Sequence, residues 1–371
     1  MRRRDLVTNA ILGAIAGFSA QSLRAERLAG SLDTLAKTRG LRFGVAVSAK
    51  TMAQPAYADL VLHHAGILVA ENAMKWQYLE PQERVISDRE AAWFARLGAA
   101  HNKAMRGHCF MWNHHDRMPV WLVDIAAATA RGAVRDLTRH MWRHGAYLAR
   151  RFGGVESWDA MNEVIDPATG EIRETHFTRA IGNRFFDLAF QIMGEKFPAA
   201  QLALNETMSW DADPRHRNGV LRLLERARQR DLPLHTLGIQ SHIGKTLGRA
   251  RDERGWRDFL QAVSDMGFAI AITEFDCSDR NIAASDPAMR DTEVAAHCRA
   301  YLDLTLDFTN VRDVVVWSLG DGASYMNRPG YPQWGRRADG LALRGHPFDD
   351  QLRPKPMFTA IEAALRAAPM R

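Results

Sequence analysis

The chain has 371 residues, 46% of them hydrophobic, which is enough for one large barrel or two ordinary domains with a sizeable core. Its formal charge of +6 includes four arginines from the first 25 residues, and no later run of Lys and Arg is interleaved with aromatic residues, so a nucleic-acid-binding protein is disfavoured. Three cysteines without C-x-x-C spacing exclude a disulfide framework and a zinc knuckle, although a Cys277–Cys298 bridge stays open.

The amino terminus has the composition of an export signal. A charged start at 1–6 precedes a short apolar run at 10–18, and Ala20 and Ser22 form a small-x-small site for signal peptidase. The apolar run is shorter than the roughly 20 residues of a membrane-spanning helix. We therefore expect residues 1–25 to be a removable signal, similar to the twin-arginine type, and the rest to be periplasmic or secreted, free of the membrane. An amphipathic leader is the alternative.

Short apolar strands alternate with helices from residue 32 onward. The first predicted helix covers 32–40 and is closed by Gly40. The predicted strands cover 41–47, 66–70, 104–112, 156–161, 201–205, 234–240, 268–273 and 311–317. Helical periodicity is clearest over 88–100, 134–152, 177–197 and 218–230.

The pattern within the strands indicates how they are arranged. Continuous apolar runs, rather than strict alternation, are expected of parallel strands that are covered on both faces. Eight such strands in one unbroken series with helices predict an α/β fold, a single (β/α)₈ TIM barrel over residues 26–371. No shift in composition marks a boundary to a second domain.

Two of the predicted strands end in acidic residues. Residues 156–164 lead from an apolar and aromatic run into Asn162 and Glu163, and residues 268–276 end in Glu274 and Asp276. The carboxyl ends of barrel strands face one cavity and present catalytic groups rigidly. Two carboxylates delivered in the same way from distant strands indicate a pair that flanks one bond.

The other strand ends carry amides, histidines and tryptophans, with few cations. Amides, carboxylates and histidines make paired hydrogen bonds to ring hydroxyls, and tryptophan stacks on the faces of sugars. The set therefore predicts a carbohydrate cleft. The candidate substrate-binding residues are Glu71, Asn72, Lys75, His108, Trp112, Asn162, Gln240, His242 and Trp317.

Several motifs, in order, resemble those of the family 10 glycoside hydrolases, which are mostly endo-1,4-β-xylanases. The matching segments are ENAMKW at 71–76, GHCFMW at 107–112, WDAMNE at 158–163, GIQSH at 238–242, ITEFD at 272–276, FDD at 348–350 and PKP at 354–356. The resemblance runs from about Ser31 to the carboxyl terminus. It implies cleavage of β-1,4-xylosidic bonds in xylan with retention, by double displacement and without a cofactor or metal. We expect a monomer whose partner is the polysaccharide.

The same resemblance implies that Glu163 is the general acid/base and Glu274 the nucleophile. Retention needs one carboxyl protonated at the leaving oxygen and another ionised at the anomeric carbon, roughly 5–5.5 Å apart. His242 is expected to hydrogen-bond Glu274 and to be oriented by Asp276, which keeps the pKa of the nucleophile low. Asn162 is expected to reach the sugar 2-hydroxyl, a contact that strengthens in the transition state.

The chain departs from the family pattern at three places. Asn113-His114-His115 stand where the family has H-S-Q, Glu206-Thr207 where it has D-Y, and Ser318 and Tyr325 where it has a glycine and a later tryptophan. The first departure predicts altered hydrogen bonding on the glycon side. Together the three leave the preferred form of xylan open.

Two alternatives belong to other functional classes. One is a metal-dependent barrel hydrolase or isomerase that acts on a sugar, because His, Glu and Asp at strand ends also bind divalent metals. No H-x-H or H-E-x-x-H spacing supports it. The other is a catalytically silent carbohydrate-binding barrel, which would be expected to lack one of the two glutamates.

Overall fold

The computed structural model describes residues 30–128, 132–182, 184–245, 247 and 251–371, so the predicted export signal lies outside the described residues. A closed parallel barrel forms its centre, as the sequence predicts. The strands pair in the order β1 (Arg42–Val47), β2 (Ile67–Ala70), β3 (Ala104–Gly107), β5 (Ser157–Asn162), β6 (Gln201–Glu206), β7 (Thr236–Ile239), β9 (Ala269–Cys277) and β10 (Val311–Val316). Pairing of β10 with β1 closes the ring.

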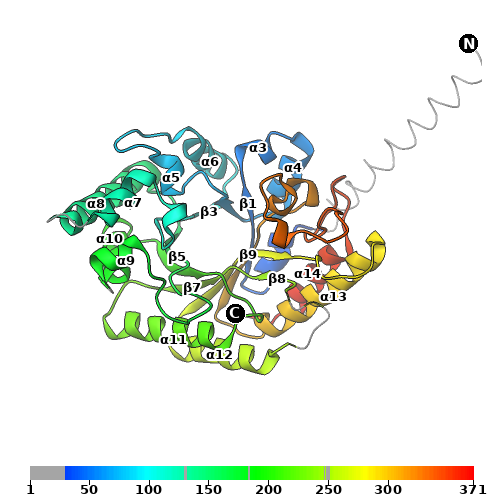
Figure 1. Ribbon diagram of the computed structural model, residues 1–371. Helices are drawn as coiled ribbons and strands as arrows, with labels where there is room; N and C mark the ends of the chain where they lie inside the picture. The colour runs from blue at the N-terminus through cyan, green and yellow to red at the C-terminus, as the bar shows by residue number, and fades with distance from the viewer. Residues whose placement is uncertain (1–29, 129–131, 183, 246, 248–250) are drawn as a thin grey trace, which may run out of the picture.

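Helices surround the strands on the outside of the barrel (Figure 1). They are α2 (Leu32–Lys37), α3 (Ala49–Met52), α4 (Pro55–His64), α5 (Trp76–Leu79), α6 (Arg89–Ala100), α7 (Val120–Ala127), α8 (Ala133–Phe152), α9 (His176–Ile181), α10 (Arg184–Lys196), α11 (Pro214–Gln229), α12 (Glu253–Asp265), α13 (Pro287–Leu306) and α14 (Pro356–Ala367). Four short 3₁₀ turns are η1 (His115–Arg117), η2 (Asp321–Ala323), η3 (Tyr325–Asn327) and η4 (Gln333–Gly335). The last helix packs against α13 and α2, so the two ends of the described chain meet on one side.

Two elements that the sequence predicts as continuous are each divided in the structure. The expected strand over 104–112 divides into β3 and a short β4 (Met111–Trp112), because the backbone leaves the sheet at His108 before it pairs again with β5. The expected helix over 177–197 is interrupted, because α9 ends at Gly182, whose backbone has a positive φ of +71° that glycine adopts readily. A second short strand, β8 (His242–Ile243), pairs with the end of β9.

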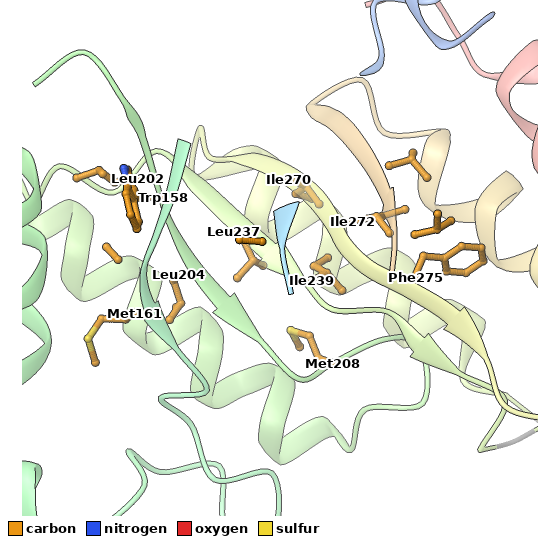
Figure 2. Packing of buried hydrophobic residues seen from close by; sticks show 14 of the residues in the cluster. Trp158, Met161, Leu202, Leu204, Met208, Leu237, Ile239, Ile270, Ile272 and Phe275 are labelled. Atoms are coloured by element: carbon orange, nitrogen blue, oxygen red, sulfur yellow. The ribbon is translucent and has the colours of Figure 1, made fainter. Parts of the chain in front are cut away.

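The hydrophobic core fills the space between the strands and the surrounding helices. Figure 2 shows Leu237, Ile239, Ile270 and Ile272, which stand side by side where β7 and β9 pair in register. All four are fully buried, which explains the uninterrupted apolar runs in the sequence. The indole of Trp158 on β5 packs against the ring of Phe197 with the ring centroids 5.2 Å apart.

The Cys277–Cys298 bridge that the sequence leaves open is not formed. All three cysteines are free and buried. A hydrogen bond with Cys298, together with burial, raises the pKa of the Cys277 thiol well above its usual value. None of the described helices combines the length and the apolar character that crossing a membrane requires.

Candidate active site

The residues predicted for the site lie at the carboxyl ends of the barrel strands or just beyond them, and barrel closure brings these ends together. Glu71, Asn72 and Lys75 follow β2, His108 follows β3, Trp112 ends β4, Asn162 ends β5 with Glu163 next, Gln240 follows β7, His242 begins β8, Glu274 and Asp276 lie in β9, and Trp317 follows β10.

Glu274 is buried and hydrogen-bonded through both carboxylate oxygens. Asn205 Nδ2 donates to Oε1 at 2.9 Å, and His242 Nε2 lies 3.2 Å from Oε2. Burial by itself would raise the pKa of the Glu274 carboxyl, but the hydrogen bond from His242 and the positive charges of His108, His242 and Lys75 lower it to about 2. Glu274 is therefore held ionised.

His242 lies between two carboxylates. Its Nδ1 is 2.8 Å from Asp276 Oδ2, on the side of the ring opposite to Glu274. Burial would lower the pKa of His242, but the charge and hydrogen bond of Asp276, with those of Glu274, raise it to about 10. The imidazolium can then donate to both carboxylates at once, as the sequence predicts for this trio.

Glu163 has a different environment. It is half-buried, and Gln240 Nε2 donates to its Oε1 at 3.1 Å. Its backbone is left-handed, with φ +54°, and its N–H donates to the carbonyl of Asn205 at 2.8 Å. Within the described part of the chain, no cation forms an ion pair with Glu163. The two glutamates therefore differ in charge environment, although both belong to one site.

A series of amide hydrogen bonds connects the two glutamates. Gln240 Nε2, which contacts Glu163, also approaches Asn162 Oδ1 at 3.4 Å, and Asn205 Nδ2 bridges Asn162 Oδ1 and Glu274, each at 2.9 Å. Thr273 Oγ1 donates to Asn205 Oδ1 at 2.7 Å, which fixes the orientation of the Asn205 amide. Asn162 is fully buried in this series, so its contact with a sugar hydroxyl stays a prediction.

Buried rings and ions line the β3 side of the site. His108 Nδ1 lies 2.8 Å from Asp159 Oδ2, and Asp159 also pairs with the buried Arg106. The rings of His108 and Trp317 are packed edge to face, with their centroids 5.5 Å apart. The ring of Trp112 is tilted against that of His108, with their centroids 6.0 Å apart. His108 and both tryptophans are therefore held in place by contacts that do not involve a substrate.

The residues after β2 form a connected polar group. Lys75 Nζ donates to Asn72 Oδ1 at 2.8 Å and lies 4.9 Å from the centre of the Trp112 ring. Burial lowers the pKa of Lys75, although nearby acidic groups oppose this. Glu71 is engaged by a residue that the sequence did not indicate. The guanidinium of Arg328 donates two hydrogen bonds to the Glu71 carboxylate. Nη1 donates to Oε1, and Nη2 donates to Oε2 at 2.9 Å.

The segment after β10 also brings aromatic rings to the site. Tyr325 lies 5.8 Å from the His242 ring and hydrogen-bonds Asp276, and burial raises its pKa well above the usual value. Tyr331 lies edge-on to Tyr325 at 5.5 Å, and Trp334 follows at 6.5 Å from Tyr331 with 73% of its surface exposed. Sequence reasoning noted Tyr325 only as a departure and missed Tyr331 and Trp334.

A cavity adjoins His242. A cavity of about 240 Å³ is bordered by Thr207, His242 and Lys245, among others. The small side chain of Thr207, after β6, helps to leave this space open. In the ranges that the structure describes, no three His, Cys, Asp or Glu side chains converge as a metal-ligand group would.

Comparisons with known proteins agree with this geometry. A model of glycosyl hydrolase family 10 matches residues 31–364. The endo-1,4-beta-xylanase of Geobacillus stearothermophilus is 28% identical over 332 residues, which are 85% of this chain and 93% of that protein. Endo-1,4-beta-xylanase A of Thermoanaerobacterium saccharolyticum is 24% identical over 88% of this chain, but the chain spans only 27% of that protein's length. The crystal structure of xylanase 10B from Thermotoga maritima superposes with a TM-score of 0.79, covering 90% of this chain and 97% of that one at 24% identity.

Proposed function

The chain belongs to glycosyl hydrolase family 10 and is a glycoside hydrolase, and we propose that it is a monomeric, retaining endo-1,4-β-xylanase with Glu274 as the nucleophile and Glu163 as the general acid/base. One observation carries the assignment of roles. Glu274 is held ionised by the imidazolium of His242, whereas the Glu163 carboxyl accepts a hydrogen bond from the neutral amide of Gln240. An attacking carboxylate and a proton donor need these opposite environments.

The reaction then proceeds in two displacements. In the first, Glu274 attacks the anomeric carbon while Glu163 gives its proton to the departing glycosidic oxygen, so that a glycosyl-enzyme ester forms and the shortened chain leaves. In the second, Glu163 takes a proton from a water molecule, whose oxygen attacks the same carbon and releases Glu274. Two inversions give net retention, and Glu163 ends in its protonated starting state.

Substrate contacts are assigned to the two sides of the glutamate pair. Glu71, Asn72 and Lys75 would bind the sugar on the glycon side, with Arg328 holding the Glu71 carboxylate in position. The other candidate residues, His108, Trp112, Asn162, Gln240 and Trp317, would line the site between them. The cavity beside Thr207 and His242 would give room for a sugar ring or a branch.

A panel of polysaccharides tests the proposed activity. Reducing-end release should be greatest from xylan or decorated xylan and small from cellulose and mannan, with and without exhaustive chelation. Release that stops on chelation and returns with zinc, manganese or magnesium would indicate the metal-dependent class instead. Sugar binding without any release would indicate a silent binding barrel.

The pH dependence of the reaction should change when His242 is replaced. In the unaltered enzyme the pKa of Glu274 is about 2, so the nucleophile stays ionised far into the acidic range. Without the imidazolium, burial raises the pKa of Glu274. We therefore expect the acidic limb of kcat/KM in His242→Asn to move to higher pH on an activated aryl xylobioside. His235→Asn, at the opposite end of the barrel, is the control, and an unmoved limb in His242→Asn would contradict the role of His242.

The pKa shifts of His242 and Glu274 also predict the pH range in which this pair stabilises the fold most. The pKa of His242 is raised from 6.5 to about 10, so its contribution to stability is complete below about 6.5 and is lost as the pH rises through 10. The pKa of Glu274 is lowered from 4.5 to about 2, so its contribution is complete above 4.5 and is lost as the pH falls towards 2. Both contributions are complete between 4.5 and 6.5, and His242→Asn should lose the most stability, measured as Tm, in that range.

Export is proposed from the first 25 residues alone, which lie outside the described residues. The charged start, the apolar run and the small-x-small site at Ala20 and Ser22 support it. Amino-terminal sequencing of the protein from the periplasm or medium of its native host should begin close to Leu23. Recovery of full-length protein only from the cytoplasm would contradict export.

A further inference from the structure

The loop that follows β5 places Glu163 by an unusual local conformation. Glu163 has a left-handed backbone, which side chains other than glycine adopt only when surrounding contacts hold them there. The N–H of Glu163 donates to the Asn205 carbonyl, and a β-bridge between Ile165 and Ile172 closes the loop. The contacts of the next two residues therefore decide where the Glu163 carboxyl lies.

Glu206, the last residue of β6, accepts hydrogen bonds from these two residues, Val164 and Ile165. It is fully buried, and its Oε1 accepts from the N–H of Val164 at 2.8 Å and from that of Ile165 at 3.1 Å. Its Oε2 faces the buried His216 Nε2 on α11 at 3.5 Å. Among the described residues, neither Glu206 Oε2 nor His216 Nε2 has a hydrogen-bond partner, so Oε1 is engaged by the loop while Oε2 only faces His216.

Asn113 holds both ends of the same loop. It is fully buried, and its Nδ2 donates to the carbonyl of Arg173 at 3.1 Å and approaches that of Val164 at 3.4 Å. Its Oδ1 accepts from Thr175 Oγ1 at 2.9 Å. The hydrogen bonds of the Asn113 side chain go to the loop after β5, so the altered hydrogen bonding on the glycon side, which the whole departure Asn113-His114-His115 predicts, stays a prediction.

Two of the three departures from the family pattern, Glu206 and Asn113, thus meet on the loop that carries Glu163. We propose that they act together as positioning residues for the general acid/base: they fix the backbone on either side of Val164 and so keep the Glu163 carboxyl at the leaving oxygen. The proposal rests on the proposed function. It predicts a defect in the proton transfers of Glu163 but not in the attack by Glu274, because Glu274 is held by Asn205 and His242 instead.

The dependence of the rate on the leaving group separates this role from a general loss of stability. A dinitrophenyl group leaves without a proton, whereas a phenyl group needs one. In Glu206→Ala, kcat/KM for phenyl xylobioside should fall at least about tenfold further than for the dinitrophenyl compound, a part of the roughly 10²–10⁴-fold that acid catalysis supplies. Glu206→Gln keeps an oxygen for both N–H groups and should restore most of the ratio between the two substrates.

Asn113→Ala tests the same role from the other side and serves if Glu206→Ala does not fold. It should show the same preference for the activated substrate. Glu80→Ala is the matched control, since Glu80 is also a buried glutamate that accepts from a backbone N–H, that of Arg84, but lies outside the site. It should lower the Tm without changing the ratio of the two rates.

The possible outcomes distinguish the positioning role of Glu206 and Asn113 from the catalytic role of Glu163. A ratio that changes in Glu163→Ala but stays at the unaltered value in folded Glu206→Ala and Asn113→Ala overturns the positioning role and leaves the proposed function standing. A ratio that does not change even in Glu163→Ala overturns the assignment of Glu163, and the positioning role with it. A change in all three variants, with Glu206→Gln near the unaltered enzyme, supports both.

Discussion

Glu274→Ala is expected to abolish the cleavage of xylan and of activated aryl xylobiosides alike, because the variant lacks the carboxylate that attacks the anomeric carbon. Removal of the nucleophile in other covalent enzymes costs on the order of 10⁶-fold in kcat, and we expect a loss of that size here for both kinds of substrate. The good leaving group does not help, since the missing step is bond formation at carbon. The measurement is kcat/KM on both substrates with the same preparation.

Azide makes this prediction more specific. A small anion can enter the space left by the Glu274 side chain and attack the activated substrate directly, which gives one displacement and a glycosyl azide of inverted configuration. Asp313→Ala is the control for the removal of a buried carboxylate, since Asp313 lies near the amino end of β10 and pairs with Arg42. Residual xylan cleavage in Glu274→Ala above roughly a hundredth of the unaltered rate would contradict the nucleophile assignment.

Glu163→Ala is expected to separate the two kinds of substrate. Xylan cleavage should fall by roughly 10²–10⁴-fold more than attack on a dinitrophenyl xylobioside, because only the natural leaving group needs the proton. The activated substrate should still form the glycosyl-enzyme, which then accumulates since no base activates the water. Added azide needs no base, so it should speed turnover and give a glycosyl azide of retained configuration.

The loop after β5 supplies a control for this variant. Glu171 lies on the same loop, is exposed, and pairs with Arg222. Glu171→Ala removes the same side chain from the same segment and should leave both rates nearly unchanged. Equal losses on both substrates in Glu163→Ala, or a first product of inverted configuration from the unaltered enzyme, would refute the assignment of roles.

Much of the barrel could be predicted from the sequence because its signals are local. A run such as 268–272 is apolar at every position, and that pattern indicates burial on both faces whatever the partner strands are. The positions of Glu163 and Glu274 followed from the fold, because the carboxyl ends of the strands in a parallel barrel meet at one mouth. Errors arose where a local signal was interrupted, as when Gly182 ended a helix that periodicity alone would continue.

What the sequence by itself determined is therefore the alternation of strands and helices and the set of strand-end residues, among them His242 and Asp276. Only the tertiary structure decided which of these residues hold one another. Arg328 reaches Glu71 across 257 residues of sequence, and the loop after β5 is contacted by Glu206 from the end of β6 and by Asn113 from just after β4. Such contacts leave no periodic trace in the sequence, because they depend on the closure of the ring and on the paths of the loops, which the whole chain sets at once.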